Sequence, residues 1–405
     1  MKKIKILRII ARLNIGGPAI HTILLAEGLD KNRFESLLVC GSPGKDEGDM
    51  LYYSLERNIE PIFIPELKRG LNFFNDVAAF RKIYNIIKIE QPDIIHTHTA
   101  KAGTLGRLAG VLYNFINRKK DKRIKLIHTF HGHIFEGYFS NFKTQVFILV
   151  ERILAFFTCR IITVSESLKK ELISLKISKE NKIEVIPLGL ELDNFLKISS
   201  RDESVLNIGI VGRLVPIKNH RLFLDAARKV ITDNPGTRLK FNIIGDGELK
   251  EELKSYSCQL GISEKVSFLG WQKDLVSIYS DLDMVALTSI NEGTPVFLIE
   301  AMASARAIVA TDVGGVRDLL GNEIKVVDKI KEGFEILEKG IIVRPQDSVS
   351  FAAALTFILR NSALRKDMGM HARDFVKNKF AKERLIRDLE GLYSNLLNLN
   401  CNESS

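Results

Sequence analysis

The chain has 405 residues, of which 45% are hydrophobic, 27% charged and 8% aromatic, fractions that exclude a disordered, collagen-like or disulfide-scaffold protein. The length predicts two or three domains with an ample core. The net charge of +10 is uneven, because residues 1–190 hold 30 Lys and Arg against 19 Asp and Glu, whereas residues 191–405 hold 29 against 30.

The beginning of the chain predicts a strand and no targeting segment. Its start is basic, but Arg8 and Arg12 interrupt the apolar stretch too early for a signal peptide. The most apolar stretch elsewhere, 144–164, contains three charged residues, whereas a helix across a bilayer needs ~20 apolar residues. The four cysteines lie far apart, which favours a reducing compartment and disfavours a thiolate zinc site. We therefore expect a cytoplasmic protein.

Short apolar runs alternate with longer amphipathic ones, the pattern of β-α-β units and a parallel sheet. In the first half we predict strands at 4–9, 35–40, 60–64, 93–96, 125–129, 160–164 and 182–186, with helices at 19–29, 74–90, 102–115 and 165–175. A second series of strands is predicted at 206–211, 239–244, 266–269, 284–288, 307–311 and 340–343.

The two series meet in a polar linker near 187–204, and charge-rich helical segments fill 364–397. We therefore expect an α/β protein of two doubly wound domains facing each other across a cleft, one at 1–190 and one at 200–378. A C-terminal helix at about 380–400 is expected to pack back on the first domain. Ligands of such sheets bind beyond the carboxyl ends of the strands.

A basic cluster at 118–125 has six Lys and Arg residues and one Asp. Such a run is usually a solvated surface, but it can also meet an anionic partner. Because no aromatic residues are interleaved and no nucleic-acid-binding module is recognisable, a lipid surface is favoured over nucleic acid.

The first candidate binding loop follows the strand at 206–211. Gly212 allows close backbone approach, and Arg213 and Lys218 follow it in the loop. Two cations beside the carboxyl end of a strand can hold a diphosphate. The alternative is a pair of ordinary surface cations.

The second candidate site surrounds the segment from Thr288 to Ala303. We predict a helix capped by Thr294 with Pro295 as its first residue, so that its free N–H groups face an anion. Glu292 precedes this helix and Glu300 lies in its second turn. One carboxylate could address a sugar and the other a ribose diol, whereas the alternative is a capping acid and a solvated helix residue.

Histidines cluster after two strands of the first half. His96 and His98 alternate at one strand end, and His128, His131 and His133 crowd another. Such groups can ligate zinc, but hydrogen-bonded cleft histidines are the ordinary alternative. The pair Asp281 and Asp283 precedes a predicted strand, so we predict a structural role for it rather than a metal-binding one.

With these motifs in place, the chain resembles the retaining glycosyltransferases of the GT-B fold, family 4. The segment Val211-Gly-Arg-Leu-Val-Pro-Ile-Lys218 resembles that family's pyrophosphate loop, and Glu292 with Glu300 resembles its Glu-x7-Glu signature. Phe268-Leu-Gly-Trp-Gln272 resembles its base-binding turn. The linker at 185–195 resembles its interdomain segment, although Leu188 stands where the family usually has Asn. The resemblance runs from about residue 4 to about residue 380.

The resemblance implies roles for individual residues. In the second domain, Arg213 and Lys218 would neutralise the nucleotide diphosphate, Glu300 would bind the ribose and Glu292 the transferred sugar. The remaining implied contacts to the nucleotide sugar come from Gly270, Trp271, Gly293, Thr294 and Pro295, and from Gly16 and Gly17 after the first strand. His131 would contact the sugar near the reaction centre, and we expect His98 and Lys101 on the acceptor side.

The resemblance also implies the reaction. A hexose or N-acetylhexosamine would move with retention from a nucleotide sugar, UDP-linked in most of the family, to a lipid-linked saccharide in surface polysaccharide or lipopolysaccharide synthesis. No cofactor or metal is expected, because Arg213, Lys218 and a helix N-terminus can stabilise the leaving group. With a lipid-linked acceptor and a basic first domain, we expect peripheral contact with the inner face of an anionic membrane.

Three other functions are kept open. A nucleotide-sugar epimerase of the same fold would need no acceptor, although its motifs differ from those of this chain. A metal hydrolase built on the histidines would need bound zinc. A degenerate relative that only binds is disfavoured by the combined presence of Arg213, Lys218, Glu292, Glu300 and His131.

Overall fold

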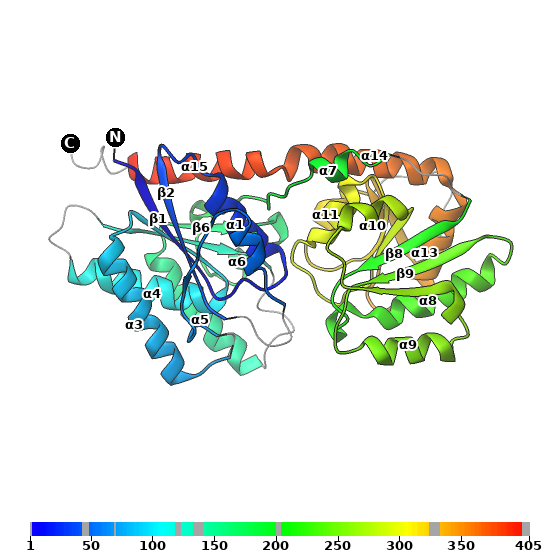
Figure 1. Ribbon diagram of the computed structural model, residues 1–405, viewed down its shortest axis with the longest axis horizontal. Helices are drawn as coiled ribbons and strands as arrows, with labels where there is room; N and C mark the ends of the chain where they lie inside the picture. The colour runs from blue at the N-terminus through cyan, green and yellow to red at the C-terminus, as the bar shows by residue number, and fades with distance from the viewer. Residues whose placement is uncertain are drawn as a thin grey trace. The chain divides into compact units, whose positions relative to one another are not determined.

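The computed structural model describes residues 2–42, 48–68, 70–117, 123–132, 141–199, 204–323 and 333–398. The chain forms two units (Figure 1). Unit 1 comprises Met1–Leu190 together with Lys382–Ser405, and unit 2 comprises Glu191–Ala381. The chain therefore leaves unit 1 once and returns to it with its last helix.

Unit 1 is built on a seven-stranded sheet in the order β3-β2-β1-β4-β5-β6-β7, with all neighbours parallel. Successive strands are added to one side from β1 to β3 and to the other side from β4 to β7, so the order reverses between β1 and β4. The strands are β1 Ile4–Ile10, β2 Phe34–Cys40, β3 Ile62–Phe63, β4 Ile94–His98, β5 Lys125–Phe130, β6 Arg160–Thr163 and β7 Ile183–Val185.

Helices cover both faces of this sheet. They are α1 Gly17–Gly28, α2 Leu51–Leu55, α3 Phe73–Glu90, α4 Ala100–Ile116, α5 Asn141–Phe157, α6 Glu166–Ser174 and α15 Lys382–Asn398, with a 3₁₀ turn at Glu180–Lys182. Neighbouring strand residues pack on opposite sides, as the pleat requires. Leu7 and Ile95 pack with α3 and α4, whereas Ile6 and Ile94 pack with α1 and α15.

Unit 2 repeats this plan. Its seven-stranded sheet has the order β10-β9-β8-β11-β12-β14-β13 and is parallel except for β13 against β14. The strands are β8 Leu206–Val211, β9 Leu239–Ile244, β10 Val266–Gly270, β11 Met284–Leu287, β12 Ala307–Thr311, β13 Phe334–Leu337 and β14 Gly340–Val343. The order reverses here between β8 and β11.

The helices of unit 2 pack in pairs on the sheet, α8 with α13 and α11 with α14 (Figure 1). They are α7 Asp193–Leu196, α8 His220–Asp233, α9 Lys250–Gln259, α10 Leu275–Asp281, α11 Val296–Ala303, α12 Val316–Leu320, α13 Ser348–Arg360 and α14 Ser362–Lys379, with 3₁₀ turns at Pro216–Lys218 and Ser263–Lys265. Among the described residues, no helix is long and apolar enough to cross a membrane.

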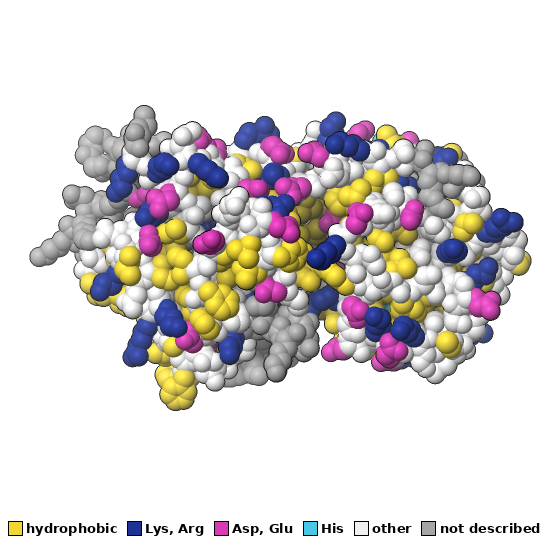
Figure 2. Space-filling model, in the orientation of Figure 1, with side chains coloured by type: hydrophobic (Ala, Val, Ile, Leu, Met, Phe, Trp, Pro, Cys, Tyr) yellow, Lys and Arg dark blue, Asp and Glu magenta, His cyan; other side chains and the backbone are white. Residues whose placement is uncertain are grey.

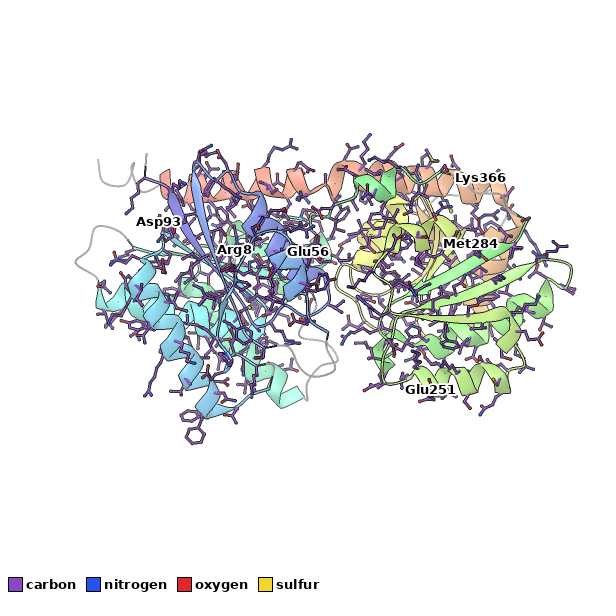
Figure 3. All side chains as sticks on the ribbon, viewed as in Figure 1. Arg8, Glu56, Asp93, Glu251, Met284 and Lys366 are labelled. Carbon is purple, nitrogen blue, oxygen red and sulfur yellow. The ribbon has the colours of Figure 1, made fainter. Side chains whose placement is uncertain are left out.

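The same kind of hydrogen bond occurs in each sheet at the point where the strand order reverses. Asp283 precedes β11, and its carboxylate accepts a hydrogen bond at 2.8 Å from the backbone N–H of Asn207, the second residue of β8. Asp93 precedes β4 and accepts the N–H of Lys5 on β1 at 2.8 Å; Figure 3 labels Asp93 within unit 1. Both carboxylates fix the amino ends of neighbouring strands, at the sheet edge opposite the carboxyl ends of the strands. The predicted structural role of Asp283 is confirmed.

The predicted strands are confirmed to within two residues at either end. The strand predicted at 93–96 continues to His98, and the one predicted at 60–64 keeps only Ile62–Phe63. The short helices α2 and α12 and the strand β13 were not predicted. Their segments, of four or five residues, are too short for a period to be recognised.

Candidate functional site

The predicted phosphate loop and the carboxylate loop lie side by side in unit 2. They follow β8 and β11, the two neighbouring strands at which the sheet order reverses. Two hydrogen bonds join the loops: Thr288 Oγ1 donates to the Lys218 carbonyl at 2.9 Å, and the N–H of Ile290 donates to the Ile217 carbonyl at 2.9 Å. Crevices at such reversal points are where open α/β sheets bind ligands.

A tight ion pair spans the two loops. Lys218 Nζ lies 2.5 Å from Glu292 Oε1, and Ser289 Oγ donates to the same oxygen at 2.6 Å. Both charged side chains are largely buried, with 21% of Lys218 and 10% of Glu292 exposed. The ammonium also lies 5.8 Å from the centre of the Phe297 ring. A cation and a carboxylate that fix each other in this way are positioned before any ligand arrives.

Open space adjoins this pair at Gly212. An added Cβ there would meet nothing nearer than the Lys218 side chain at 3.9 Å, so packing does not explain the glycine. Gly245, after β9, is different: its φ is +136° and a Cβ would lie 1.9 Å from the Gly212 carbonyl oxygen. Arg213 follows Gly212 and is exposed at the same strand end. The loops after β8 and β9 therefore touch through backbone, leaving the face of Gly212 free for a ligand.

The start of α11 differs from the prediction. The helix begins at Val296, with Pro295 in the capping position, and Thr294 makes no capping bond. Instead, Thr294 Oγ1 is buried without a hydrogen-bond partner. The neighbouring Gly293 accepts a bond from the N–H of Gly315 at 2.9 Å, which ties this loop to the one after β12. The predicted N-cap was wrong by one residue, because this tie holds the backbone at Gly293 and Thr294 away from the helix.

Glu300 points to a buried tyrosine. The hydroxyl of Tyr279, on α10, donates to Glu300 Oε2 at 3.1 Å and approaches the carbonyl of Phe297 at 2.9 Å. Burial raises the pKa of Glu300 to about 7, while the bond from Tyr279 opposes that rise. The carboxyl group is therefore partly buried on α11, held by one donor and able to accept a second.

Gly270 is the last residue of strand β10, and Trp271 follows it. Gly270 has a φ of +68°, and its carbonyl accepts the N–H of Gly245 at 2.9 Å. Trp271 is half exposed. Both lie at the same carboxyl edge of the sheet as Gly212 and Glu292, two strands away from β8.

In unit 1, a second group of side chains gathers at the corresponding reversal between β1 and β4. His98 ends β4, and His131 follows β5; their Nδ1 and Nε2 atoms are 3.0 Å apart. His21, on α1, lies with its ring centre 5.0 Å from that of His131 and 5.8 Å from that of His98. Gly16 and Gly17 begin the same helix, and Gly16 caps it with a φ of +153°.

These three histidines are neutral at pH 7. Burial lowers the pKa of His131 to about 3 and holds the pKa values of His21 and His98 well below the usual range. One ring nitrogen from each histidine lies within 4.8 Å of those from the other two, and among the described residues no other group of His, Cys, Asp and Glu is arranged to share an ion. Since His98 and His131 already bond each other, an ion would have to replace that bond.

The other histidines do not join this group. His96 shares the face of His98, as predicted, with ring centres 4.3 Å apart, but its nitrogens contact Tyr393 and Thr129 at 2.7 Å each. His128 points to the opposite face and bonds Thr97 Oγ1 at 2.8 Å. His133 lies outside the described residues. Zinc binding by the whole predicted set would thus need side chains from two faces of the sheet.

Lys101 lies in the first turn of α4, but its ammonium group is already occupied. It pairs with Asp76 on α3 at 2.5 Å and donates to the carbonyl of Gly70. Only 10% of the side chain is exposed. Lys101 therefore ties α4 to the start of α3.

Two residues of these groups were missed in the sequence. His21 lies in the apolar run Ala19–Leu25, one turn after Gly17. A polar residue within an apolar run is the signal that could have identified it. Tyr279 gave no signal, because its pairing with Glu300 depends on how α10 packs against α11.

Comparison with known proteins identifies the family. A model described as Glycosyltransferase Family 4 matches residues 15–194, and one described as Glycosyl transferases group 1 matches residues 206–361. The chain is 28% identical over 382 residues, 92% of each chain, to UDP-Gal:alpha-D-GlcNAc-diphosphoundecaprenol alpha-1,3-galactosyltransferase of Escherichia coli. It is 28% identical over 345 residues, 82% of this chain and 84% of the relative, to the capsular polysaccharide biosynthesis glycosyltransferase CapM of Staphylococcus aureus.

Solved structures agree on the fold. The Anabaena protein Alr3699/HepE, crystallised in complex with UDP, superposes with a TM-score of 0.75 at 19% identity, covering 97% of this chain and 100% of that one. Two Rossmann-like units joined in this order, matched in turn by the two family models, make the chain a member of the family 4 glycosyltransferases with the GT-B fold.

Proposed function

We propose that this glycosyltransferase moves a hexose or N-acetylhexosamine, with retention, from a UDP-sugar to a lipid-linked saccharide. The reaction would serve the synthesis of a surface polysaccharide or lipopolysaccharide. The E. coli relative is named for a UDP-galactose donor and a diphosphoundecaprenol-linked acceptor, and CapM for capsular polysaccharide synthesis. The donor would bind in unit 2 and the acceptor on the side of unit 1.

The arrangement around Lys218 and Glu292 carries the proposal. A diphosphate beside Gly212 would meet Lys218 and Arg213, and the loss of a nucleoside diphosphate concentrates negative charge there in the transition state. The Lys218 ammonium, shared with Glu292 in the free protein, can strengthen its bond to phosphate as that charge develops. Glu292, fixed by Lys218 and Ser289, is then left to accept hydroxyl groups of the sugar.

The remaining residues complete the proposed assignment. Glu300, with Tyr279 behind it, would accept a ribose hydroxyl, and the turn at Gly270 and Trp271 would hold the base. The loop at Gly293, Thr294 and Pro295 would face the sugar phosphates, where the unpartnered Thr294 hydroxyl can donate.

In unit 1, we propose sugar contact for His131, support of the acceptor by His98, and closure over the substrates by the loop at Gly16 and Gly17. Lys101 would not touch the acceptor. It would hold the start of α3 in place through its ion pair with Asp76.

No metal or other cofactor takes part in the proposed reaction. The two cations after β8 supply the positive charge that a divalent ion would otherwise bring to the diphosphate. The protein would work in the cytoplasm, in peripheral contact with the inner face of the membrane that carries its acceptor. Transfer that is unchanged by EDTA would support the metal-free reaction, and transfer restored only by an added divalent ion would contradict it.

The test is a transfer assay with purified protein. UDP-glucose, UDP-galactose and their N-acetylated forms are offered with an N-acetylglucosamine-diphosphoundecaprenol acceptor, and NMR of the product reads the anomeric configuration. We expect transfer from one donor with retention, loss of at least a hundredfold in Glu292→Gln, and no loss in Glu264→Gln, an exposed carboxylate outside the site. Conversion of a UDP-sugar without acceptor would instead show an epimerase.

A further inference from the structure

Three histidines of unit 1 converge from three separate elements. His21 lies on α1, His98 ends β4 and His131 follows β5. No fourth His, Cys, Asp or Glu of the described chain joins them. We call these three side chains the histidine group. The proposed transfer reaction uses His98 and His131 and leaves His21 without a role.

The ring of His21 is buried without a hydrogen bond. Only 1% of the residue is exposed, and neither ring nitrogen has a partner among the described residues. His98 Nε2 and His131 Nδ1 are likewise buried without a partner there. Each of these nitrogens has lost a hydrogen bond to water, which costs stability. Buried polar groups of this kind require an explanation, and the binding of an ion is one.

The spacing of the three rings matches a single tetrahedral ion. With Zn–N bonds of about 2.1 Å, imidazoles on one zinc ion have ring centres about 5.2 Å apart and nitrogens about 3.4 Å apart. The ring centre of His131 lies 5.0 Å from that of His21 and 5.3 Å from that of His98, and the third separation is 5.8 Å. His98 Nδ1 and His131 Nε2, 3.0 Å apart, would separate slightly to share the ion.

The chemistry of the group selects the kind of ion. Neutral imidazole nitrogens are ligands that zinc prefers, and three histidines with a fourth, open position form a common zinc set. Magnesium and calcium prefer oxygen ligands, of which the group has none. His131 is not fully buried, so the group borders solvent on that side.

Two features predict that the ion is held only weakly. In strong zinc sites, the second ring nitrogen of each histidine bonds a carboxylate or carbonyl, whereas these second nitrogens have no such partner in the described chain. Positive charge also lies nearby: Arg8 Nη1 is 3.4 Å from His96 Nδ1, and the ring of His96 lies 4.3 Å from that of His98. Weak binding fits a reversible ligand better than a resident cofactor.

We propose that the histidine group binds Zn²⁺ reversibly and that the bound ion inhibits sugar transfer. The ion would occupy Nε2 of His131, the side chain to which we assign sugar contact, so the two ligands would compete for it. The inhibition rests on the proposed function. The binding of the ion does not, because it depends only on the three rings.

Other zinc-binding groups must be separated from this one. Exposed carboxylates lie among basic side chains on the face of unit 2 drawn in Figure 2. Oxygen sites of that kind also take Mg²⁺. His371 of α14 lies 3.8 Å from Asp367, and both side chains are exposed. It supplies the matched control, a histidine beside a carboxylate far along the chain from the histidine group.

Calorimetric titration of the full chain, free of metal and without a polyhistidine tag, tests the binding. We expect a single Zn²⁺ per chain with a micromolar Kd, no binding of Mg²⁺ in the same range, and the visible absorption of a tetrahedral nitrogen site when Co²⁺ is added. His21→Phe should raise the Kd for Zn²⁺ by at least about tenfold. His371→Phe should leave it unchanged.

The melting temperature of His21→Phe without metal shows whether the substitution damages the fold. Phe keeps a ring in the same place and removes two nitrogens that have no partner in the described chain, so we expect no decrease. A lower melting temperature would mean that hydrogen bonds hold His21, which would overturn the proposal. So would an unchanged Kd in His21→Phe, or no binding of Zn²⁺ by the wild type.

Transfer rates at rising Zn²⁺ concentration test the inhibition, each protein being compared with its own rate without zinc. The wild type and His371→Phe should lose half their rate near the measured Kd, and His21→Phe only at a concentration at least about tenfold higher. Zinc that binds through His21 without slowing transfer would overturn the inhibitory role. A chain that binds zinc through His21 but transfers no sugar would support the metal site and contradict the proposed function.

Discussion

The carboxyl group of Glu300 should make nucleoside binding depend on pH near neutrality. Its pKa is raised to about 7, so lowering the pH from 8 to 6 protonates it in the free protein. The ionised form accepts a ribose hydroxyl best, and we expect the affinity for uridine to fall by about tenfold over this range. Titration of uridine, which carries no phosphate, isolates this effect. In Glu300→Gln the affinity should be low and independent of pH.

The same group should make stability depend on pH in the opposite sense. Because its pKa is about 7 in the folded protein and 4.5 in the unfolded chain, the folded state binds the proton more tightly. This contribution to stability is complete below pH 4.5 and is lost as the pH rises through about 7; it corresponds to at most about 3 kcal/mol. Urea unfolding measures the free energy of unfolding at pH 5 and at pH 8. Its decrease from pH 5 to pH 8 should be smaller for Glu300→Gln than for the wild type. An equal decrease would mean that Glu300 titrates normally.

Lys218 is expected to recognise phosphate and not the nucleoside. A charge-assisted hydrogen bond contributes roughly 1.5–3 kcal/mol, so Lys218→Gln should weaken UDP binding by about 10- to 100-fold. Uridine affinity should stay within about twofold, because uridine lacks the diphosphate. Lys265→Gln, an exposed lysine of the same unit, provides the control. Calorimetric titration measures the affinities of the wild type, Lys218→Gln and Lys265→Gln. Equal losses of affinity for UDP and for uridine in Lys218→Gln would show that the substitution damages the whole site.

Among the elements, α4 and α5 depend on the Arg107–Glu151 pair. Removing one partner leaves a buried, unpaired charge, so Arg107→Met should cost about 3–5 kcal/mol of unfolding free energy. In the double variant with Glu151→Leu no charge is stranded, and most of that loss should be recovered. Urea unfolding of Arg107→Met, Glu151→Leu and the double variant gives the coupling free energy between the two side chains. Purely additive losses would show that the pair is solvated in solution.

At the level of elements, periodicity predicts most strands of the sheets. It fails where tertiary contacts determine where an element begins. Strands such as Leu206–Val211 are runs of apolar residues bounded by turns, and their bounds follow from the sequence. Thr294 and Pro295 have the residue types of a helix start, yet α11 begins one residue later because Gly293 is tied to Gly315. That bond joins loops after two different strands, which local patterns do not record.

At the scale of the whole molecule, unit 1 is closed by a helix from the far end of the chain. Arg8 on β1, labelled in Figure 3, is fully buried and donates to the hydroxyl of Tyr393 on α15 at 2.8 Å. Tyr393→Phe should cost about 1–3 kcal/mol, because the buried guanidinium then loses its shortest hydrogen bond and keeps only those to Ser36, His96 and Leu25. Urea unfolding followed by a probe in each unit should place the loss in unit 1. A loss in unit 2 alone would contradict the role of this contact.

The candidate site was predictable only in part. Arg213, Lys218, Glu292 and Glu300 belong to spaced motifs, and parallel strands bring the ends of β8 and β11 to one edge. The sequence does not show that Lys218 and Glu292 form an ion pair, since 74 residues separate them. His21 was missed for the same reason, because its neighbours come from β4 and β5.

The most direct test of the account is the melting temperature of the full chain with UDP, GDP and ADP, each with and without EDTA. A ligand that binds the folded state raises that temperature. We predict a rise with UDP that EDTA does not change and that Glu300→Ala abolishes, because the β8 and β11 loops hold the diphosphate and Glu300 holds the ribose. No rise with any nucleoside diphosphate, or a rise only in the presence of a divalent metal ion, would contradict a metal-independent nucleotide site in unit 2.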